Sequence, residues 1–205
     1  KFFDVNKQLE RLNYIPLNTK LQNQMRTERV SKSLESEGLD AYIVTREPNI
    51  FYLTGSNSGG ILIIAPDTHP ILLPPRLNLY LAQDSALGCC IESYERKEKE
   101  VKIVEKLNQI KTEKIGFDEL SLIEYQMIKK KLGSVVLKEN HDLIWAMRKV
   151  KDLSEQKFMK RAGALSDLGM EAIQEFLTEG VREHEVAASA ASAIRMEGAI
   201  DISFP

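Results

Sequence analysis

The sequence predicts an α/β domain over its first two thirds and a pair of helices after it. Short apolar runs of strand character alternate with segments of helical periodicity up to about residue 140. Such alternation is typical of a three-layer α/β domain with a mixed sheet. After residue 140 two long helical segments follow each other with no strand between them. Glycines and capping residues at the ends of several helical segments support these limits.

The first helix is expected over residues 18–38. Asn18 or Thr19 could cap its start, and Gly38 would terminate it. Apolar residues at helical spacing predict its buried face: Leu21, Met25, Val30 and Leu34. A strand over 41–45 follows, and Pro48 suits the start of a short helix that ends on Gly55.

The remaining elements of the α/β part continue the alternation. They are expected as strands 60–65 and 71–75, helix 76–86, strand 89–94, helix 98–108, strand 114–117, helix 120–132 and strand 134–137. Strands 60–65 and 71–75 are expected to form a hairpin, because Pro66 and Asp67 favour a turn between them. Cys89 and Cys90 are interpreted as small apolar residues of a buried strand, since a disulfide between neighbouring cysteines is strained.

A domain boundary is expected near residue 140, between an α/β domain at 1–140 and a second part at 141–205. The second part opens with an amphipathic linker helix over 141–150. A long helix follows, with Asp152 and Glu155 spaced as a capping box and Gly180 as its end. Its predicted buried stripe consists of Phe158, Leu165, Leu168, Ala172, Ile173 and Phe176. A second helix, 182–197, precedes the opening of a strand at 200–204.

Composition limits the classes of partner. The net charge of −2 and the 43% of apolar residues give no reason to expect nucleic acid or a membrane as partner. No apolar run approaches the roughly 20 residues that span a bilayer. No segment has the pattern of a signal peptide, so we expect a cytoplasmic protein.

The residues alone do not form a complete active site. The three histidines are far apart, and the sequence has no H-E-x-x-H, G-x-S-x-G, phosphate-loop or dinucleotide-binding motif. Asp201 stands out because aspartate is disfavoured in the strand expected there. It could lie near a site or on the solvent side, and the sequence leaves both open.

Three segments together resemble the creatinase/prolidase family. They are EPNIFYLTG at 47–55, MRKVKDLSEQKFMKRAGALSDLGMEA at 147–172 and LTEGVREHEVAASAASAIRMEGAIDISFP at 177–205. The resemblance implies a creatinase N-terminal-like α/β domain at 1–140. Residues 141–205 would then be the linker helix and the truncated start of a pita-bread α+β domain, with its first two helices.

The same resemblance implies a metal-dependent Xaa-Pro peptidase, either a dipeptidase or an aminopeptidase, acting on Xaa-Pro peptides as a homodimer. Two divalent ions (Mn, Co or Zn) would be held by residues beyond Pro205, so this chain alone is expected to bind no metal and to be inactive. Two alternatives stay open. One is a non-catalytic peptide- or protein-binding member of the same fold, and the other is a creatinase-like hydrolase without metal.

The resemblance also suggests three substrate-pocket residues, and none that is catalytic or binds metal. Phe204 would lie just before the active-site strand. Tyr52 and Asn57 belong to the segment that, in dimeric prolidases, approaches the active site of the other subunit. For Tyr52 a packed core aromatic is an equally good interpretation.

Overall fold

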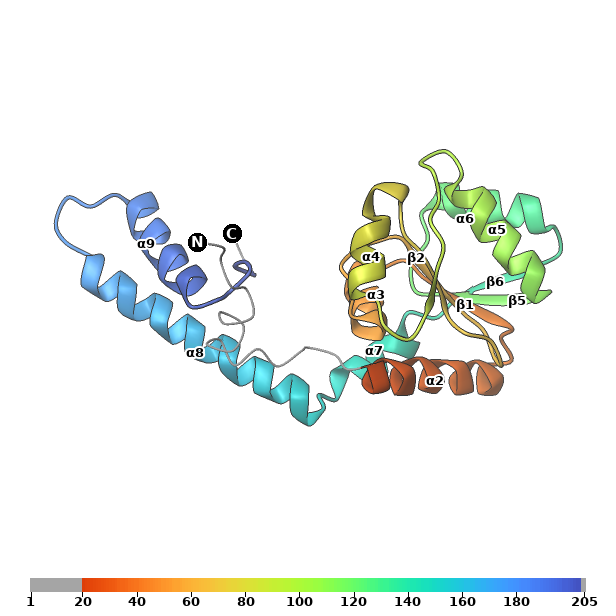
Figure 1. Cartoon of the computed structure of the whole chain (residues 1–205), viewed down its shortest axis with the longest axis horizontal. Coiled ribbons are helices and arrows are strands. Elements are labelled where there is room, and N and C mark those ends of the chain that lie inside the picture. The colour runs from red at the N-terminus through yellow and green to blue at the C-terminus, as the bar shows by residue number, and fades with distance from the viewer. Residues whose placement is uncertain (1–19, 204–205) are drawn as a thin grey trace, which may run out of the picture. The chain divides into compact units, whose positions relative to one another are not determined.

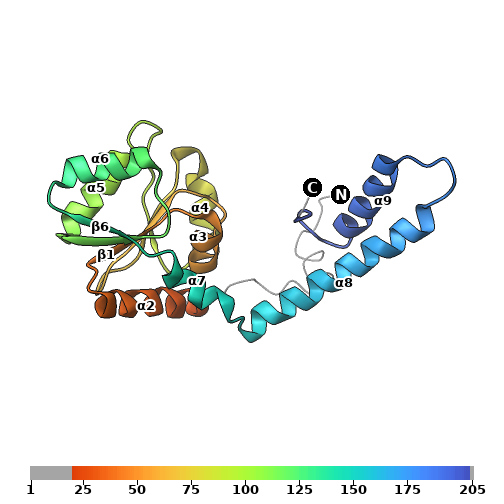
Figure 2. The ribbon, with the colours of Figure 1, turned by 180° about the vertical axis from the view of Figure 1, so that it is seen from behind.

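The computed structural model describes residues 20–203, which fall into two compact units. The first unit holds the described residues up to Val150, and the second unit begins at Lys151. Figures 1 and 2 show the two units from opposite sides.

A six-stranded mixed sheet forms the centre of the first unit, in the order β4-β3-β2-β1-β5-β6. Its strands are β1 (Ala41–Val44), β2 (Ile61–Ile64), β3 (Ile71–Leu73), β4 (Cys90–Ile91), β5 (Lys114–Phe117) and β6 (Val136–Glu139). β1 is antiparallel to β2 and parallel to β5. All residues of β1 and β2 are buried, which fits strands covered on both faces. The predicted α/β class and the hairpin of β2 and β3 are therefore confirmed.

Helices cover both faces of the sheet (Figures 1 and 2). They are α2 (Lys20–Glu37), α3 (Glu47–Thr54), η1 (Arg76–Asn78), α4 (Leu79–Ser85), α5 (Lys99–Ile110), α6 (Leu122–Leu132) and α7 (Asp142–Lys149). One core joins Tyr42, Val44 and Leu62 of the sheet to α2, α3, α4 and α7. The other joins Ile43 and Ile63 to α5 and α6. Successive side chains of a strand point to opposite faces of the sheet, so the sheet separates two cores, as in a three-layer domain.

Two expectations about apolar segments were wrong. Leu21 and Met25 of α2 are 66% and 55% exposed, because the buried face of this part of the helix is polar and includes Arg26. β4 contains only two residues of the expected strand 89–94. It lies at the edge of the sheet, so Cys90 is exposed and Cys89 only half-buried. Burial and the neighbouring Cys90 still raise the pKa of the Cys89 thiol to about 12.

The first unit ends later than the boundary expected at residue 140. α7 contributes Ile144 and Met147 to the core shared with α2 and α3. The backbone at Asn140 is also held, because the buried Tyr42 hydroxyl donates to its carbonyl at 2.7 Å. The helix expected to link the two parts is therefore an element of the first unit, which closes at Val150.

The second unit contains two packed helices, α8 (Leu153–Phe176) and α9 (Glu183–Met196). The predicted capping box is present. Asp152 accepts from the N–H groups of Ser154 and Glu155, and the Glu155 carboxylate accepts from the Asp152 N–H. α8 ends at Phe176 and not at Gly180, because the chain is already extended at Leu177.

The apolar stripe of α8 is covered on one side only. Gly169, which is not one of the stripe residues, is the one buried residue of α8 in the part of the chain that the structure describes. A Cβ there would meet the Ile194 side chain of α9 at 2.6 Å. Phe176 stays 43% exposed. The stripe that the sequence predicts as buried is therefore only partly covered by α9 in the described residues.

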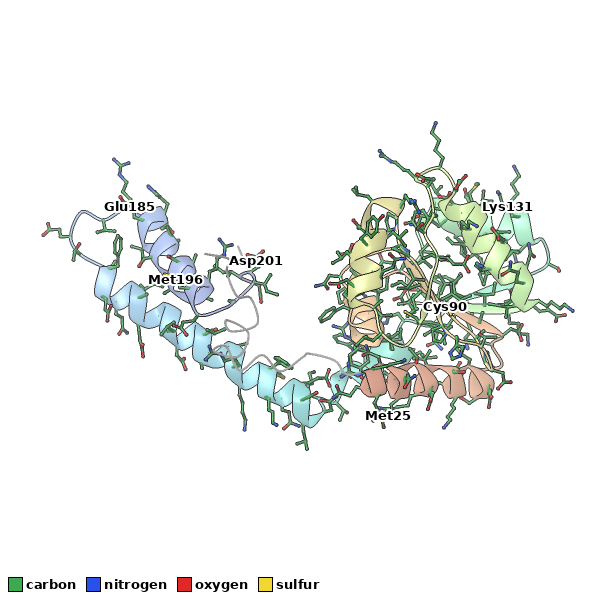
Figure 3. All side chains as sticks on the ribbon, viewed as in Figure 1. Met25, Cys90, Lys131, Glu185, Met196 and Asp201 are labelled. Carbon is green, nitrogen blue, oxygen red and sulfur yellow. The ribbon has the colours of Figure 1, made fainter. Side chains whose placement is uncertain are left out.

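The strand expected at 200–204 is not formed over its described residues, 200–203. Asp201 is exposed and accepts from Arg195 at 2.8 Å and from the Ile202 N–H at 2.9 Å. These bonds hold the pKa of the Asp201 carboxyl below its usual value. Met196 and Asp201 lie at the C-terminal end of α9 (Figure 3).

Candidate functional site

Several loops of the first unit meet on the side of the sheet where the strands β1 and β5 end. We call this side the carboxyl edge; it is distinct from the outermost strands of the sheet. β1 and β5 are parallel and both end there. β2 is antiparallel to β1, so it begins at this edge, and β3 returns to it. The loop between α3 and β2, the residue after β5 and the start of η1 therefore share the edge. In open α/β sheets, ligands bind preferentially at the ends of parallel strands.

Asp118 follows β5 at the carboxyl edge and is only 2% exposed. Its Oδ1 accepts from the N–H groups of Thr45 at 2.9 Å and Glu119 at 2.7 Å. Its Oδ2 accepts from the Asn49 side-chain amide at 2.8 Å and from the Arg46 N–H at 3.3 Å. Both oxygens are therefore bonded to donors of the protein itself, as a buried carboxylate requires. This carboxylate joins the ends of β1 and β5 to the start of α3.

Asn49 extends this arrangement to α7. The Arg148 guanidinium donates to Asn49 Oδ1 at 2.8 Å, while Asn49 Nδ2 donates to Asp118. Asn49 is 4% exposed and Arg148 half-buried. Polar groups of two segments that the sequence places far apart, 47–55 and 147–172, thus meet directly.

The loop over residues 55–60 has a well-defined conformation. Gly55 ends α3 in the left-handed region, at φ 78°. Ser56 and Ser58 are buried. The Ser85 hydroxyl of α4 donates to Ser56 Oγ at 2.7 Å, and Asn78 of η1 donates to the Ser58 carbonyl at 2.8 Å. The loop is thereby held on η1 and α4.

The structure describes two of the three predicted pocket residues, Tyr52 and Asn57. Tyr52 is 9% exposed and belongs to the core. Arg26 donates to its carbonyl at 2.9 Å and lies 4.0 Å from its ring centroid. Asn57 is exposed at the tip of the loop 55–60. Phe204 lies outside the described residues. Tyr52 and Asn57 thus differ in exposure, and the contact of all three residues with substrate stays a prediction.

An exposed apolar patch adjoins this loop. It consists of Leu77, Tyr80 and Leu81, which are 92%, 83% and 48% exposed. The bond from Asn78 to Ser58 places η1 directly beside the loop. Large exposed apolar residues that gather in this way commonly mark interaction surfaces.

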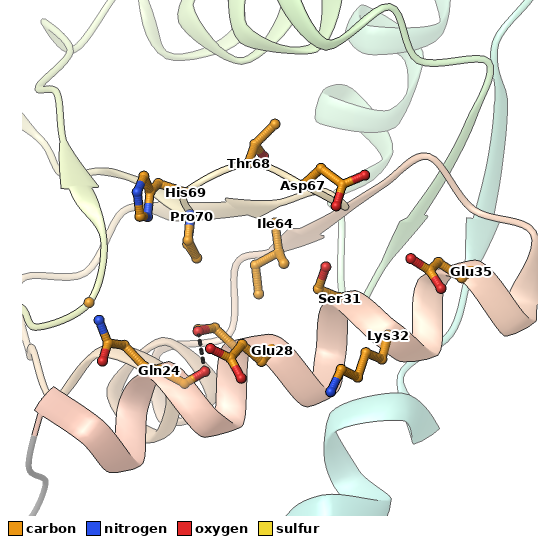
Figure 4. Close-up of a pocket in the computed structure, with 12 residues that line it drawn as sticks. Gln24, Glu28, Ser31, Lys32, Glu35, Ile64, Asp67, Thr68, His69 and Pro70 are labelled. Atoms are coloured by element: carbon orange, nitrogen blue, oxygen red, sulfur yellow. Dashed lines mark hydrogen bonds between the residues drawn. The ribbon is translucent and has the colours of Figure 1, made fainter.

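A groove lies elsewhere on the first unit, between α2 and the turn that joins β2 to β3 (Figure 4). It has a volume of about 420 Å³ and is lined by side chains of both charges, among them Glu28, Lys32, Asp67 and His69. Among residues 20–203, no group of three or more His, Cys, Asp or Glu could hold a metal ion. The described residues therefore do not fit a metal centre.

No pattern in the sequence indicates that Asp118, Asn49 and Arg148 form a connected set. Each is an ordinary polar residue near the end of an element, and nothing in their spacing indicates contact. A buried carboxylate after a strand is visible only once the strand order is known. Pairing of β5 with β1 brings Asp118 next to Thr45, although 73 residues separate the two in the sequence.

Comparison with known proteins gives consistent matches. A family model described as the Creatinase/Prolidase N-terminal domain matches residues 26–150. An Xaa-Pro dipeptidase of Pyrococcus horikoshii is 25% identical over 179 residues, covering 85% of this chain and 48% of that protein. The chain thus spans about half the length of the curated relatives it matches.

Solved structures agree with these matches. A prolidase from Pyrococcus furiosus superposes with a TM-score of 0.75 at 26% identity, over 85% of this chain and 54% of that chain. An Xaa-Pro aminopeptidase (aminopeptidase P) from Streptococcus thermophilus superposes with a TM-score of 0.53 at 27% identity. That match covers 62% of this chain and 98% of the other.

Proposed function

The chain belongs to the creatinase/prolidase N-terminal domain family, and on this premise we propose that it is the N-terminal part of an Xaa-Pro peptidase. The observation that carries the proposal is the extent of the match. The alignment with the Pyrococcus horikoshii dipeptidase covers 85% of this chain, more than the family model's residues 26–150, and so reaches into the second unit. The whole protein would cleave the peptide bond that precedes proline.

The chemistry in this proposal belongs to a part of the protein beyond Pro205. Two divalent metal ions there would polarise the scissile carbonyl and activate water. Because the described residues hold no fitting donor set, we derive no catalytic step from them. The half-covered stripe of α8 and α9 supports a further sheet as the missing cover.

Activity of the full-length protein tests the proposal. It is expected to hydrolyse Xaa-Pro dipeptides or longer Xaa-Pro peptides, and not matched peptides with alanine in place of proline. Chelation should lower the rate about hundredfold or more, and Mn²⁺ or Co²⁺ should restore it. The 205-residue chain, assayed in parallel, should be inactive. Hydrolysis that survives chelation would indicate a creatinase-like hydrolase, and peptide binding without turnover would indicate a binding protein. Either outcome contradicts the metallopeptidase proposal.

We also propose a homodimer, with the apolar patch of Leu77, Tyr80 and Leu81 at the interface. The exposure of the patch and its position beside the loop 55–60 support this. Leu77→Asp is expected to convert the full-length dimer to a monomer in sedimentation equilibrium, because the charge would be buried without a partner. Leu122→Asp is the matched control, since Leu122 is 70% exposed on α6, over the other core. A wild-type monomer at micromolar concentration, or a Leu77→Asp dimer, would refute the assignment.

The cytoplasm is the compartment in this proposal. The free cysteines, Cys89 and Cys90, are consistent with a reducing environment. In the part of the chain that the structure describes, no helix has the length and apolar character needed to cross a membrane.

A further inference from the structure

α7 is held to the rest of the first unit by apolar packing and by polar contacts at both of its ends. Its buried residues are Ile144 and Met147. At its N-terminal end the chain is tied through the backbone, since the Asn140 N–H donates to the Phe117 carbonyl at 2.9 Å. The outer face of the helix is open to solvent, with Trp145 44% exposed. A helix of eight residues with two buried side chains is a candidate for local opening.

The polar contact at the other end of α7 has a fixed direction. Arg148 can only donate hydrogen bonds, and the Asp118 carboxylate can only accept them. Asn49 lies between the two, so its amide oxygen must face Arg148 and its amide nitrogen must face Asp118. The amide thus links a positive and a negative group that do not touch each other. Reversing it would set donor against donor and acceptor against acceptor.

We propose that Arg148, Asn49 and Asp118 form a latch that holds α7 on the first unit. With the latch broken, α7 leaves the domain as a unit while the sheet stays folded. The latch acts on the last helix before the second unit, so it fixes the point at which the chain leaves the first unit. This inference goes beyond the proposed peptidase function and does not depend on it.

Hydrogen exchange of the 205-residue chain tests the latch. In the wild type, amides of α7 are expected to exchange faster than amides of β1, because α7 opens without the sheet. Arg148→Met should accelerate exchange in α7 about tenfold, since a hydrogen bond to a charged group is lost. Arg46→Met is the matched control, because Arg46 forms an exposed ion pair with Glu119 on the same edge. It should leave exchange in α7 unchanged.

A core variant separates local opening from global unfolding. Ile103 of α5 is fully buried in the other core. Ile103→Val should accelerate exchange in β1 about fivefold and leave α7 unchanged, because this contact survives when α7 opens. If α7 and β1 exchange at one rate, or respond equally to both variants, α7 is not a separate unit and the proposal fails.

The role of Asn49 as the link between Arg148 and Asp118 is tested by a further pair of variants. Asn49→Leu should accelerate exchange in α7 as Arg148→Met does, and the double variant should exchange no faster than the single ones. Arg148→Lys keeps a cationic donor and should recover part of the protection. Additive effects of the two single variants, or no recovery with lysine, would show that Arg148 acts independently of Asn49 and would overturn the latch.

Discussion

Asp118→Asn is expected to lower the free energy of unfolding of the first unit by about 3 kcal/mol. The wild-type carboxylate uses both oxygens as acceptors, for N–H groups of Thr45 and Glu119 on one side and for Asn49 and the Arg46 N–H on the other. An amide in the same place must turn its NH₂ group toward one of these sets of donors. Those donors would then be buried without an acceptor.

Asp40→Asn is the control for this variant. Asp40 also caps backbone groups, but its Oδ2 alone accepts from the N–H groups of Glu113 and Lys114, at 2.7 and 2.8 Å. An asparagine there can keep its oxygen in place and turn its NH₂ group away. Urea unfolding followed by far-ultraviolet circular dichroism measures both variants. The fluorescence of Trp145, the single tryptophan, is not used, because Trp145 lies on α7 and would also report local opening of that helix. Equal losses of stability in the two would contradict the explanation from acceptor geometry.

Gly60→Ala is expected to destabilise the first unit by about 3 kcal/mol or more. Gly60 adopts φ 101°, a region that residues with a Cβ rarely enter. A Cβ there would lie 2.2 Å from the Leu73 carbonyl oxygen, which belongs to the backbone of β3 and cannot turn aside. The loop 55–60 or the pairing of β2 with β3 would have to shift.

Gly38→Ala separates the two causes. Gly38 also has a positive φ, 61°, but a Cβ there meets nothing within 4 Å. It should cost only about 1 kcal/mol, from backbone strain alone. The same urea titration compares the two. A loss for Gly60→Ala no larger than that for Gly38→Ala would mean that the loop adapts and that the close approach to Leu73 carries no energy.

Local patterns in the sequence predicted most of the elements. Capping residues and terminal glycines act within a few positions, so the Asp152 cap of α8 and the end of α3 at Gly55 are visible in the sequence. The failures involve contacts between distant segments. The polar face of α2 is buried because Arg26 meets the Tyr52 carbonyl, and no local pattern announces this. Cys90 is exposed because β4 is an edge strand, and strand order is a global property.

The candidate site was predictable only in outline. The segment 47–55 attracted attention by resemblance, yet Tyr52 is packed in the core while Asn57 is exposed at a loop tip. The periodicity of apolar residues predicts the face of a helix or strand on which a side chain lies. It does not predict which loops meet at the ends of neighbouring strands. Asp118, Asn49 and Arg148 meet at the carboxyl edge, so the structure was needed to find them.

The strand order has a consequence for how the chain folds. β1, β2 and β3 are neighbours in sequence and in the sheet, so they can pair after closing short loops. The pairing of Ala41 with Ile115 has to wait until β5 has been synthesised, and closing that longer loop costs more entropy. During this interval the backbone groups of β1 that later pair with β5 have no partner strand, and all four residues of β1 belong to the future core. A nascent chain is therefore most exposed to aggregation after β3 has emerged from the ribosome and before β5 follows.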